Sequence, residues 1–167
     1  MHTSSTQRIL AISPGTKYLG LAFFEGDDLS QFGVKTLGGR KTEQNLLPRV
    51  EAFLDELIEL HRPDVLVVME LFYAQRRLSP LLGKLISALV RRGRERRILV
   101  RRYMPTELKK RFCEERRTRR NLAGAMVRRH WFLRSFLKRE STRGYWQQMF
   151  DAVALGQMAL SDVTKVA

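Results

Sequence analysis

The stretch RILAISPGTKYLGLAFF, residues 8–24, decides the fold of this chain. An apolar run at residues 9–12 enters the short loop SPGTK at residues 13–17, and a second apolar run follows at residues 19–24. Two short apolar runs that flank proline, glycine and polar residues are typical of a strand, a turn and a second strand. Such a hairpin places Ser13 at the end of the first strand. Open α/β sheets form their functional sites at strand ends, so we expect Ser13 to lie at such a site.

The composition predicts a single domain with a nucleic-acid partner. The chain has 167 residues, of which 44% are hydrophobic, and this is enough for one substantial core. Its 31 lysines and arginines outnumber its 17 acidic residues, and the formal net charge is +14. A surplus of this size favours a polyanionic partner, and a nucleic acid over a membrane surface.

The N-terminal residues and the cysteine content bear on the cellular compartment that we expect for this protein. The single cysteine, Cys113, excludes an intrachain disulfide framework and a cysteine-based zinc site. No apolar stretch is long enough to span a bilayer, and residues 1–7 lack the apolar core of a secretory signal. We expect residues 1–167 to form one domain with a flexible N-terminus at 1–7, in a reducing, cytoplasmic setting.

After the hairpin, strands alternate with helices. A strand is expected at residues 29–37, and apolar residues between Leu46 and Ile58 share one face of a helix that Thr42 caps. Residues 64–69, DVLVVM, predict a buried central strand. The remaining elements expected are a helix at 78–90 that ends around Gly93, a strand at 98–100, a short helix from Pro105, a helix from Thr118 through Trp131 and a last helix at 145–160. This order predicts a mixed α/β sheet with helices on its faces.

Two carboxylates stand out by their positions. Glu70 ends the central strand, and Asp151 interrupts the otherwise apolar stretch MFDAVAL at residues 149–155. An acidic residue among apolar neighbours needs a reason to be there, because charged side chains are rarely buried without a partner. The alternatives to a catalytic pair are a solvated strand end for Glu70 and a satisfied polar position at a helix start for Asp151.

Three motifs in this order resemble the RuvC-like nucleases, the Holliday junction resolvases with a ribonuclease H-like fold. The hairpin begins ILAISPGT at residues 9–16, where the family pattern is close to ILGIDPG followed by threonine or serine. VMELFY at residues 68–73 resembles the family's I-E-x-x-F, and DAVALGQMA at residues 151–159 resembles D-A-x-A-L-A-x-A. The resemblance spans nearly the whole chain, and it implies an antiparallel hairpin, then parallel strands, flanked by helices.

The resemblance also implies a metal-dependent endonuclease, with four ligand positions of which two depart from the family. Glu70 and Asp151 match its metal-binding carboxylates, but Ser13 stands where the family has the aspartate that bridges both metals. Gln148 stands where it has an aspartate or a histidine. Phosphodiester hydrolysis in such sites uses two Mg²⁺ ions about 4 Å apart, and Mg²⁺ prefers anionic oxygen ligands. We therefore expect weak or absent binding of Mg²⁺ or Mn²⁺, and weak or absent cleavage.

The DNA-contacting positions of the family have better matches. Tyr73 stands where the family places an aromatic side chain that wedges into the junction centre, and stacking is worth roughly 1–3 kcal/mol per base. Arg76 and Arg77 follow on what the resemblance makes a DNA-facing loop. Lys109 and Arg120 match basic positions that flank the family's active site. The alternatives are a half-buried tyrosine and solvated charges.

Three hypotheses of function follow. The first is a structure-selective protein that binds branched DNA, above all a Holliday junction, through a degenerate nuclease site. The second is an active Mg²⁺- or Mn²⁺-dependent junction endonuclease with an altered ligand set, and the third is a non-catalytic basic module that binds RNA or a ribonucleoprotein. Glu70 with Asp151 favours the first two, and Ser13 with Gln148 favours the first over the second. The resemblance further implies a homodimer through the helix at 78–90, for which a core-facing helix is the alternative.

Overall fold

The computed structural model of the chain describes residues 6–71, 79–137 and 144–166, with side chains as far as residue 162. The strands are β1 (Arg8–Ser13), β2 (Tyr18–Glu25), β3 (Asp28–Thr36), β4 (Val65–Met69) and β5 (Leu99–Tyr103). The helices are α1 (Glu43–His61), α2 (Pro80–Glu95), α3 (Pro105–Phe112), α4 (Arg119–Arg129), α5 (Arg134–Leu137) and α6 (Tyr145–Val166), with a short 3-10 helix, η1, at Trp131–Leu133.

The strands form one mixed sheet in the order β3-β2-β1-β4-β5. β1 pairs antiparallel with β2, and β2 pairs antiparallel with β3, so the chain opens with a meander. β4 pairs in parallel with β1, and β5 pairs in parallel with β4. The predicted α/β class, an antiparallel hairpin followed by parallel strands, is confirmed.

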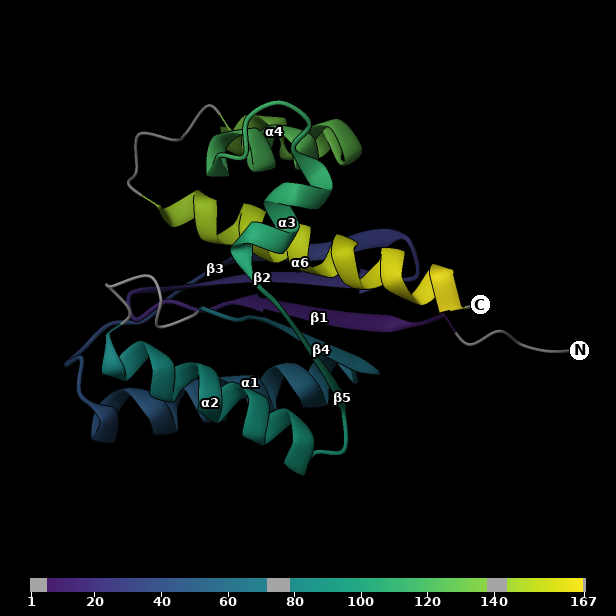
Figure 1. The fold of residues 1–167 in the computed structure, drawn as a ribbon. Coiled ribbons are helices and arrows are strands. Elements are labelled where there is room, and N and C mark those ends of the chain that lie inside the picture. Colours follow the sequence, from purple (N-terminus) through teal and green to yellow (C-terminus); the bar gives the residue numbers. More distant parts are fainter. Residues whose placement is uncertain (1–5, 72–78, 138–143, 167) are drawn as a thin grey trace, which may run out of the picture.

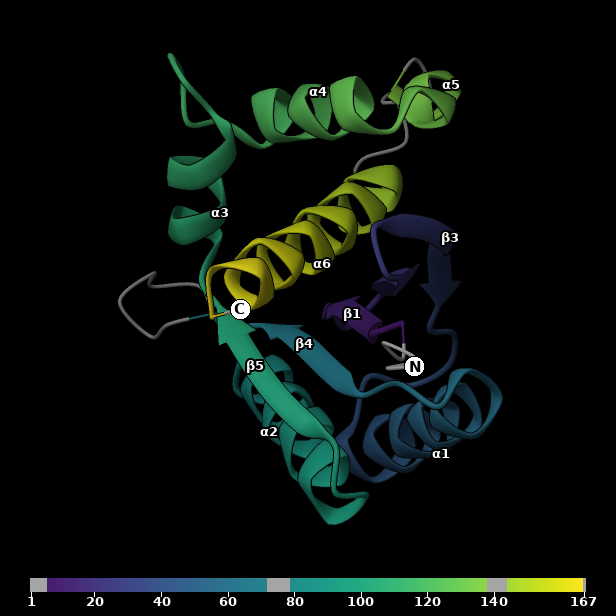
Figure 2. The same ribbon diagram turned by 90° about the vertical axis from the view of Figure 1, so that its right-hand side faces the viewer.

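Helices cover both faces of this sheet. α1 and α2 lie on one face, and α6 crosses the other (Figure 1). α3 and α4 lie on the outer side of α6, away from the sheet (Figure 2). Because alternate residues of a strand point to opposite faces, Ile9 and Ala11 of β1 belong to the core beneath α6. Leu10 and Ile12 belong to the core beneath α1 and α2.

Two glycines let α6 lie directly on the first two strands. A Cβ atom at Gly20 of β2 would overlap the backbone carbonyl of Gln148, and one at Gly156 of α6 would overlap the ring of Phe24. Helix and strand therefore approach more closely than a side chain at either position permits. Gly20 pairs with Ser13, so the same contact brings the first turns of α6 over the end of β1.

The helix starts predicted at Thr42, Pro105, Thr118 and Tyr145 are confirmed, whereas α2 begins at Pro80 and its expected start at residue 78 lies outside the described residues. The hydroxyl groups of Thr42 and Thr118 accept hydrogen bonds from the backbone N–H groups of Asn45 and Asn121, as N-capping residues do. Pro105 is the first residue of α3, where its missing N–H leaves no hydrogen bond unmade.

Three predicted helix ends were wrong, because α6 continues to Val166, beyond the expected residue 160, and the ends of α2 and α4 differ as well. α2 continues through Gly93 for two further residues, because Gly93 is buried against the sheet. A Cβ atom there would lie 2.7 Å from the side chain of Leu66, so the glycine serves close packing rather than helix termination. α4 ends at Arg129, and Trp131 lies in the separate helix η1.

The first residues of the chain are described in part. The carbonyl of Gln7 accepts a hydrogen bond from the backbone N–H of Gly26, whereas residues 1–5 lie outside the described segments. The flexible N-terminus and the single domain stay predictions. No helix within the described segments is both long enough and apolar enough to cross a membrane.

Replacing Gly20 by alanine should destabilise the protein, because the added methyl group meets the backbone of α6. We expect the free energy of unfolding to fall by about 1–3 kcal/mol, with a decrease in Tm of roughly 2–4 °C per kcal/mol. Gly33→Ala on β3 is the matched control, since a Cβ atom there meets no described atom within 4 Å. Urea denaturation measures both variants, and equal stability of the two would contradict the close contact.

Candidate functional site

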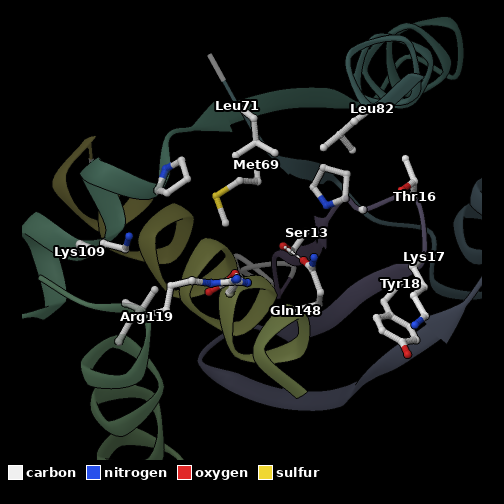
Figure 3. Close-up of a pocket in the computed structure, with 15 residues that line it drawn as sticks. Ser13, Thr16, Lys17, Tyr18, Met69, Leu71, Leu82, Lys109, Arg119 and Gln148 are labelled. Atoms are coloured by element: carbon white, nitrogen blue, oxygen red, sulfur yellow. Dashed lines mark hydrogen bonds and ion pairs between the residues drawn. The ribbon is translucent and has the colours of Figure 1, made fainter. Parts of the chain in front are cut away.

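A pocket of about 440 Å³ opens at the carboxyl ends of β1 and β4 (Figure 3). The loop at residues 13–18 forms one wall, and the start of α6 contributes Gln148 and Asp151. Lys109 of α3 and Arg119 of α4 reach the pocket from the outer helices. These elements meet here because α6 lies across the strand ends and supports α3 and α4 on its outer side.

Ser13 and Gln148 meet in this pocket. Ser13 is the last residue of β1, is only 2% exposed and points to the α6 face of the sheet, as Ile9 and Ala11 do. Its Oγ donates a hydrogen bond of 2.6 Å to Oε1 of Gln148 (Figure 3). The two neutral residues that stand at the family's ligand positions are therefore bonded to each other.

The carboxylate of Asp151 is buried, and both of its oxygens are engaged. Nη2 of Arg119 lies 2.7 Å from Oδ2, and Nε2 of Gln147 donates a hydrogen bond of 3.1 Å to Oδ1. Burial raises the pKa of Asp151 above its ordinary value, while Arg119, Gln147 and Lys109 oppose that rise. Arg119 thus provides the counter-charge that a buried carboxylate needs.

The carboxylate of Glu70 does not join this pocket. The register of β1 and β4 places Ser13 level with Met69. Glu70 follows Met69, the last residue of β4, and is not among the residues that line the pocket; its carboxylate lies beside β5 instead. Oε1 of Glu70 lies 3.4 Å from Nη1 of Arg102 on that strand. The structure therefore brings together three of the four expected ligand positions and leaves Glu70 outside.

Arg119 is the pocket residue that sequence reasoning missed. The expected basic residue was its neighbour Arg120, which lines a separate cavity. A signal was present, because Arg119 precedes the buried Leu122 by three residues and therefore shares its face of α4. Gln147 was missed as well, although it stands four residues before the aspartate that it contacts on α6.

The other expected nucleic-acid contacts divide into two groups. Lys109 lines the pocket, in agreement with its expected place beside the site, and its role stays a prediction. Tyr73, Arg76 and Arg77 lie outside the described residues.

The donor set does not fit a divalent metal. Within the described segments, no three His, Cys, Asp or Glu side chains gather closely enough to hold a metal ion. The described lining has one carboxylate, Asp151, and three cations, Lys17, Lys109 and Arg119. Mg²⁺ and Mn²⁺ are bound by hard and mostly anionic oxygen ligands. This pocket instead favours an anion such as a phosphate group, because cationic N–H donors predominate in it.

α2 packs as a core-facing helix. Leu85 and Leu89 are buried in the core that α2 shares with α1 and the sheet. On its polar side, Nη2 of Arg92 lies 2.5 Å from Oδ2 of Asp55 on α1. The expected homodimer through this helix stays a prediction.

The layers, the strand order and the pocket at the strand ends define a ribonuclease H-like α/β fold. The particular form of this fold is similar to that of solved RuvC structures. The chain is similar to Thermus thermophilus RuvC in complex with Holliday junction substrate, with a TM-score of 0.70, 21% identity and coverage of 95% of this chain and 96% of that chain. The Thermus thermophilus RuvC structure gives a TM-score of 0.69 and 21% identity, over 95% of this chain and 97% of that one.

The yeast mitochondrial Holliday junction resolvase Ydc2 is similar as well, with a TM-score of 0.59, 14% identity and coverage of 96% of this chain and 81% of that chain. No protein-family profile and no curated protein matches the sequence. The RuvC-like fold that the three sequence motifs predict is thus confirmed at the level of structure.

Asp151→Asn should stabilise the protein near neutral pH. Because the pKa of Asp151 is raised on folding, its folded carboxylate carries a burial penalty at every pH above that pKa. The penalty is lost as the pH falls below 3.8, the ordinary pKa, where the group is protonated in both states. The stability gained by the variant should therefore be greatest near pH 7 and shrink on acidification.

Urea denaturation of both proteins at a series of pH values measures this difference. If the variant is instead less stable than the unmodified protein near pH 7, and this deficit shrinks as the pH falls, the ion pair with Arg119 outweighs the burial of Asp151.

Proposed function

We propose that this protein binds branched DNA, above all a four-way junction, and that its pocket has lost efficient metal-dependent cleavage. The fold supports this proposal, because one solved structure with the same fold is a complex with a Holliday junction substrate. The main observation behind the proposed loss of cleavage is a pair of contacts in the pocket at the strand ends. Ser13 donates a hydrogen bond to Gln148, and Arg119 forms an ion pair with Asp151, so these polar groups bind one another.

The pocket has the chemistry of a phosphate site. The guanidinium of Arg119 has five N–H donors, and its described ion pair with Asp151 uses one nitrogen. The side chain is 48% exposed, so its other donors are open to a phosphate oxygen. An arginine that a buried carboxylate holds in place loses less conformational freedom on binding. Lys17 and Lys109 add two ammonium groups to the lining.

The same contacts oppose metal-dependent hydrolysis. A divalent ion at Asp151 would compete with Arg119 for the same carboxylate oxygens. Neither Ser13 nor Gln148 supplies negative charge, and the carboxylate of Glu70 is paired with Arg102 instead of lining the pocket. The pocket therefore lacks the anionic ligands that hold two metal ions against the attacking and leaving oxygens of a phosphodiester. We propose weak or absent binding of Mg²⁺ and Mn²⁺.

Further DNA contacts in this proposal come from the resemblance. Tyr73 would stack in the junction centre, and Arg76 and Arg77 would contact phosphates beside it. Arg120 lines a second cavity of about 800 Å³ along α4, where a neighbouring phosphate would lie. A homodimer through α2 would present two pockets to one junction.

Junction binding should not require a divalent metal. We expect a fluorescent four-way junction to bind equally well in EDTA and in Mg²⁺, with an affinity that falls steeply as the salt concentration rises. Each neutralised phosphate contributes a log–log slope of about −0.9, so Lys109→Ala should reduce the steepness of that slope by about 1. Lys84→Ala is the matched control, because Lys84 pairs with Glu43 on the opposite side of the sheet.

Fluorescence anisotropy at several salt concentrations makes this measurement. Binding that appears only with Mg²⁺ would contradict a metal-independent pocket. Tighter binding of RNA than of the junction would favour the basic RNA-binding module instead.

Restoring the missing carboxylates should restore metal binding. Ser13→Asp with Gln148→Asp places two new negative charges in the pocket of Asp151. We expect Mg²⁺ or Mn²⁺ to raise the Tm of this double variant and to leave that of the unmodified chain nearly unchanged, because a ligand of the folded state stabilises it. Without metal, repulsion among the carboxylates should lower the stability of the double variant.

The neutral pair Ser13→Asn with Gln148→Asn is the control, since it changes shape in the pocket without adding charge. Cleavage of a labelled junction on a denaturing gel is the second readout. An unmodified chain that cleaves as fast as the double aspartate variant would support the active-nuclease hypothesis and contradict ours.

A further inference from the structure

The corner where α4 ends carries two aromatic side chains that face solvent. Trp131 is 80% exposed and Phe132 is 38% exposed. Tryptophan is highly buried on average, so an indole as exposed as this one is a candidate contact surface. Both residues belong to η1, the short helix between α4 and α5.

The residues on either side of Trp131 pack against β3 and α6, although the indole itself is exposed. The ring of Phe132 stacks on that of Phe32 of β3, with centroids 5.6 Å apart at 27°. Nε2 of His130, at the end of α4, lies 3.0 Å from Oε1 of Gln157 on α6. Trp131 meets Phe132 at an interplanar angle of 78° with centroids 6.1 Å apart. Trp131 therefore rests on an ordered aromatic base.

Arginines surround this corner. Arg128, Arg129 and Arg134 are exposed, and in the described part of the chain none of the three forms an ion pair with an acidic side chain. The sequence has no aspartate or glutamate at residues 116–137. The guanidinium of Arg129 also lies over the ring of Phe112, 5.2 Å from its centroid. Positive charge that no described acidic side chain neutralises, beside an exposed aromatic ring, is the combination that binds single-stranded nucleic acid.

α4 connects this corner with the pocket. Arg119 begins α4 and lines the pocket, and Trp131 follows its end, so about 16 Å of helix separates them. The cavity of about 800 Å³ lies along the same helix. Its charged lining residues are Arg116, Arg120, Arg128, Glu114 and Glu115. The lining of this cavity carries three arginines and two glutamates, so positive charge predominates along α4 between the pocket and the corner.

We propose that Trp131 is a stacking platform for an unpaired base, and that Arg128, Arg129 and Arg134 contact the phosphates beside that base. The inference rests on the proposed function only in taking nucleic acid as the ligand, because the platform lies outside the pocket. The ligand that fits both regions is a duplex or junction with a single-stranded extension.

The small number of tryptophans allows a direct test. Trp146→Phe leaves Trp131 as the only tryptophan of the chain. Trp146 packs against Phe136 with ring centroids 4.6 Å apart, a contact that phenylalanine can retain. In EDTA, a duplex with a single-stranded tail should quench the fluorescence of Trp131 saturably. A blunt duplex should quench it weakly.

Affinity measurements provide the second arm of the test. Trp131→Ala should weaken binding of the tailed duplex by about 5- to 150-fold, the range for the loss of one stacked base. It should leave binding of the blunt duplex nearly unchanged, and Trp131→Phe should recover part of the loss. Leu60→Ala is the matched control, because Leu60 is 73% exposed on α1, across the sheet.

The outcomes separate the platform from the proposed function. If the tailed duplex binds but Trp131 fluorescence does not change, or if Trp131→Ala weakens both duplexes equally, the platform is wrong and the proposed function stands. A change in oligomeric state with unchanged DNA affinity in Trp131→Ala would assign the indole to self-association and also overturn the platform. If no DNA binds the unmodified protein, both proposals are wrong.

Discussion

The close packing of α6 on β1 and β2 is the contact on which the rest of the structure depends. Gly20 and Gly156 have no side chains at the points of nearest approach, so the helix backbone rests directly on the strands. This placement brings the start of α6 over the end of β1, where Gln148 meets Ser13. The outer side of α6 supports α3 and α4, which carry Lys109 and Arg119, two of the three cations in the described pocket lining. One contact between a helix and a sheet thereby helps to assemble a site from segments that lie far apart in the chain.

The buried carboxylate of Asp151 decides the chemistry of that site. A buried carboxylate needs a positive partner, and either a metal ion or an arginine can provide it. Here the partner is Arg119, and the neighbouring polar residues of the pocket, Ser13 and Gln148, are neutral. A metal site gains affinity from clustered negative charge, whereas this pocket has more cations than carboxylates. The same fold therefore favours a phosphate here, in keeping with a chain whose formal net charge is +14.

The sequence by itself determined the local elements and the charge of the protein. The hairpin around Ser13, the N-caps Thr42 and Thr118 and the central strand before Glu70 all depend on residues within a few positions of one another. Such signals are readable because turn residues, capping hydroxyls and apolar runs act over short stretches. The neutral charge of Ser13 and Gln148 was also visible from the sequence, since it follows from residue type alone.

The tertiary structure alone decided which of these residues meet. Ser13 ends β1 and Glu70 directly follows β4, but Ser13 lines the pocket whereas Glu70 pairs with Arg102 of β5. Ser13 and Gln148 meet across 135 positions because α6 folds back onto the hairpin. The helical phase of α4 selects Arg119 over Arg120 for the pocket. Register and phase arise from packing between distant segments, and for that reason residue order alone does not determine them.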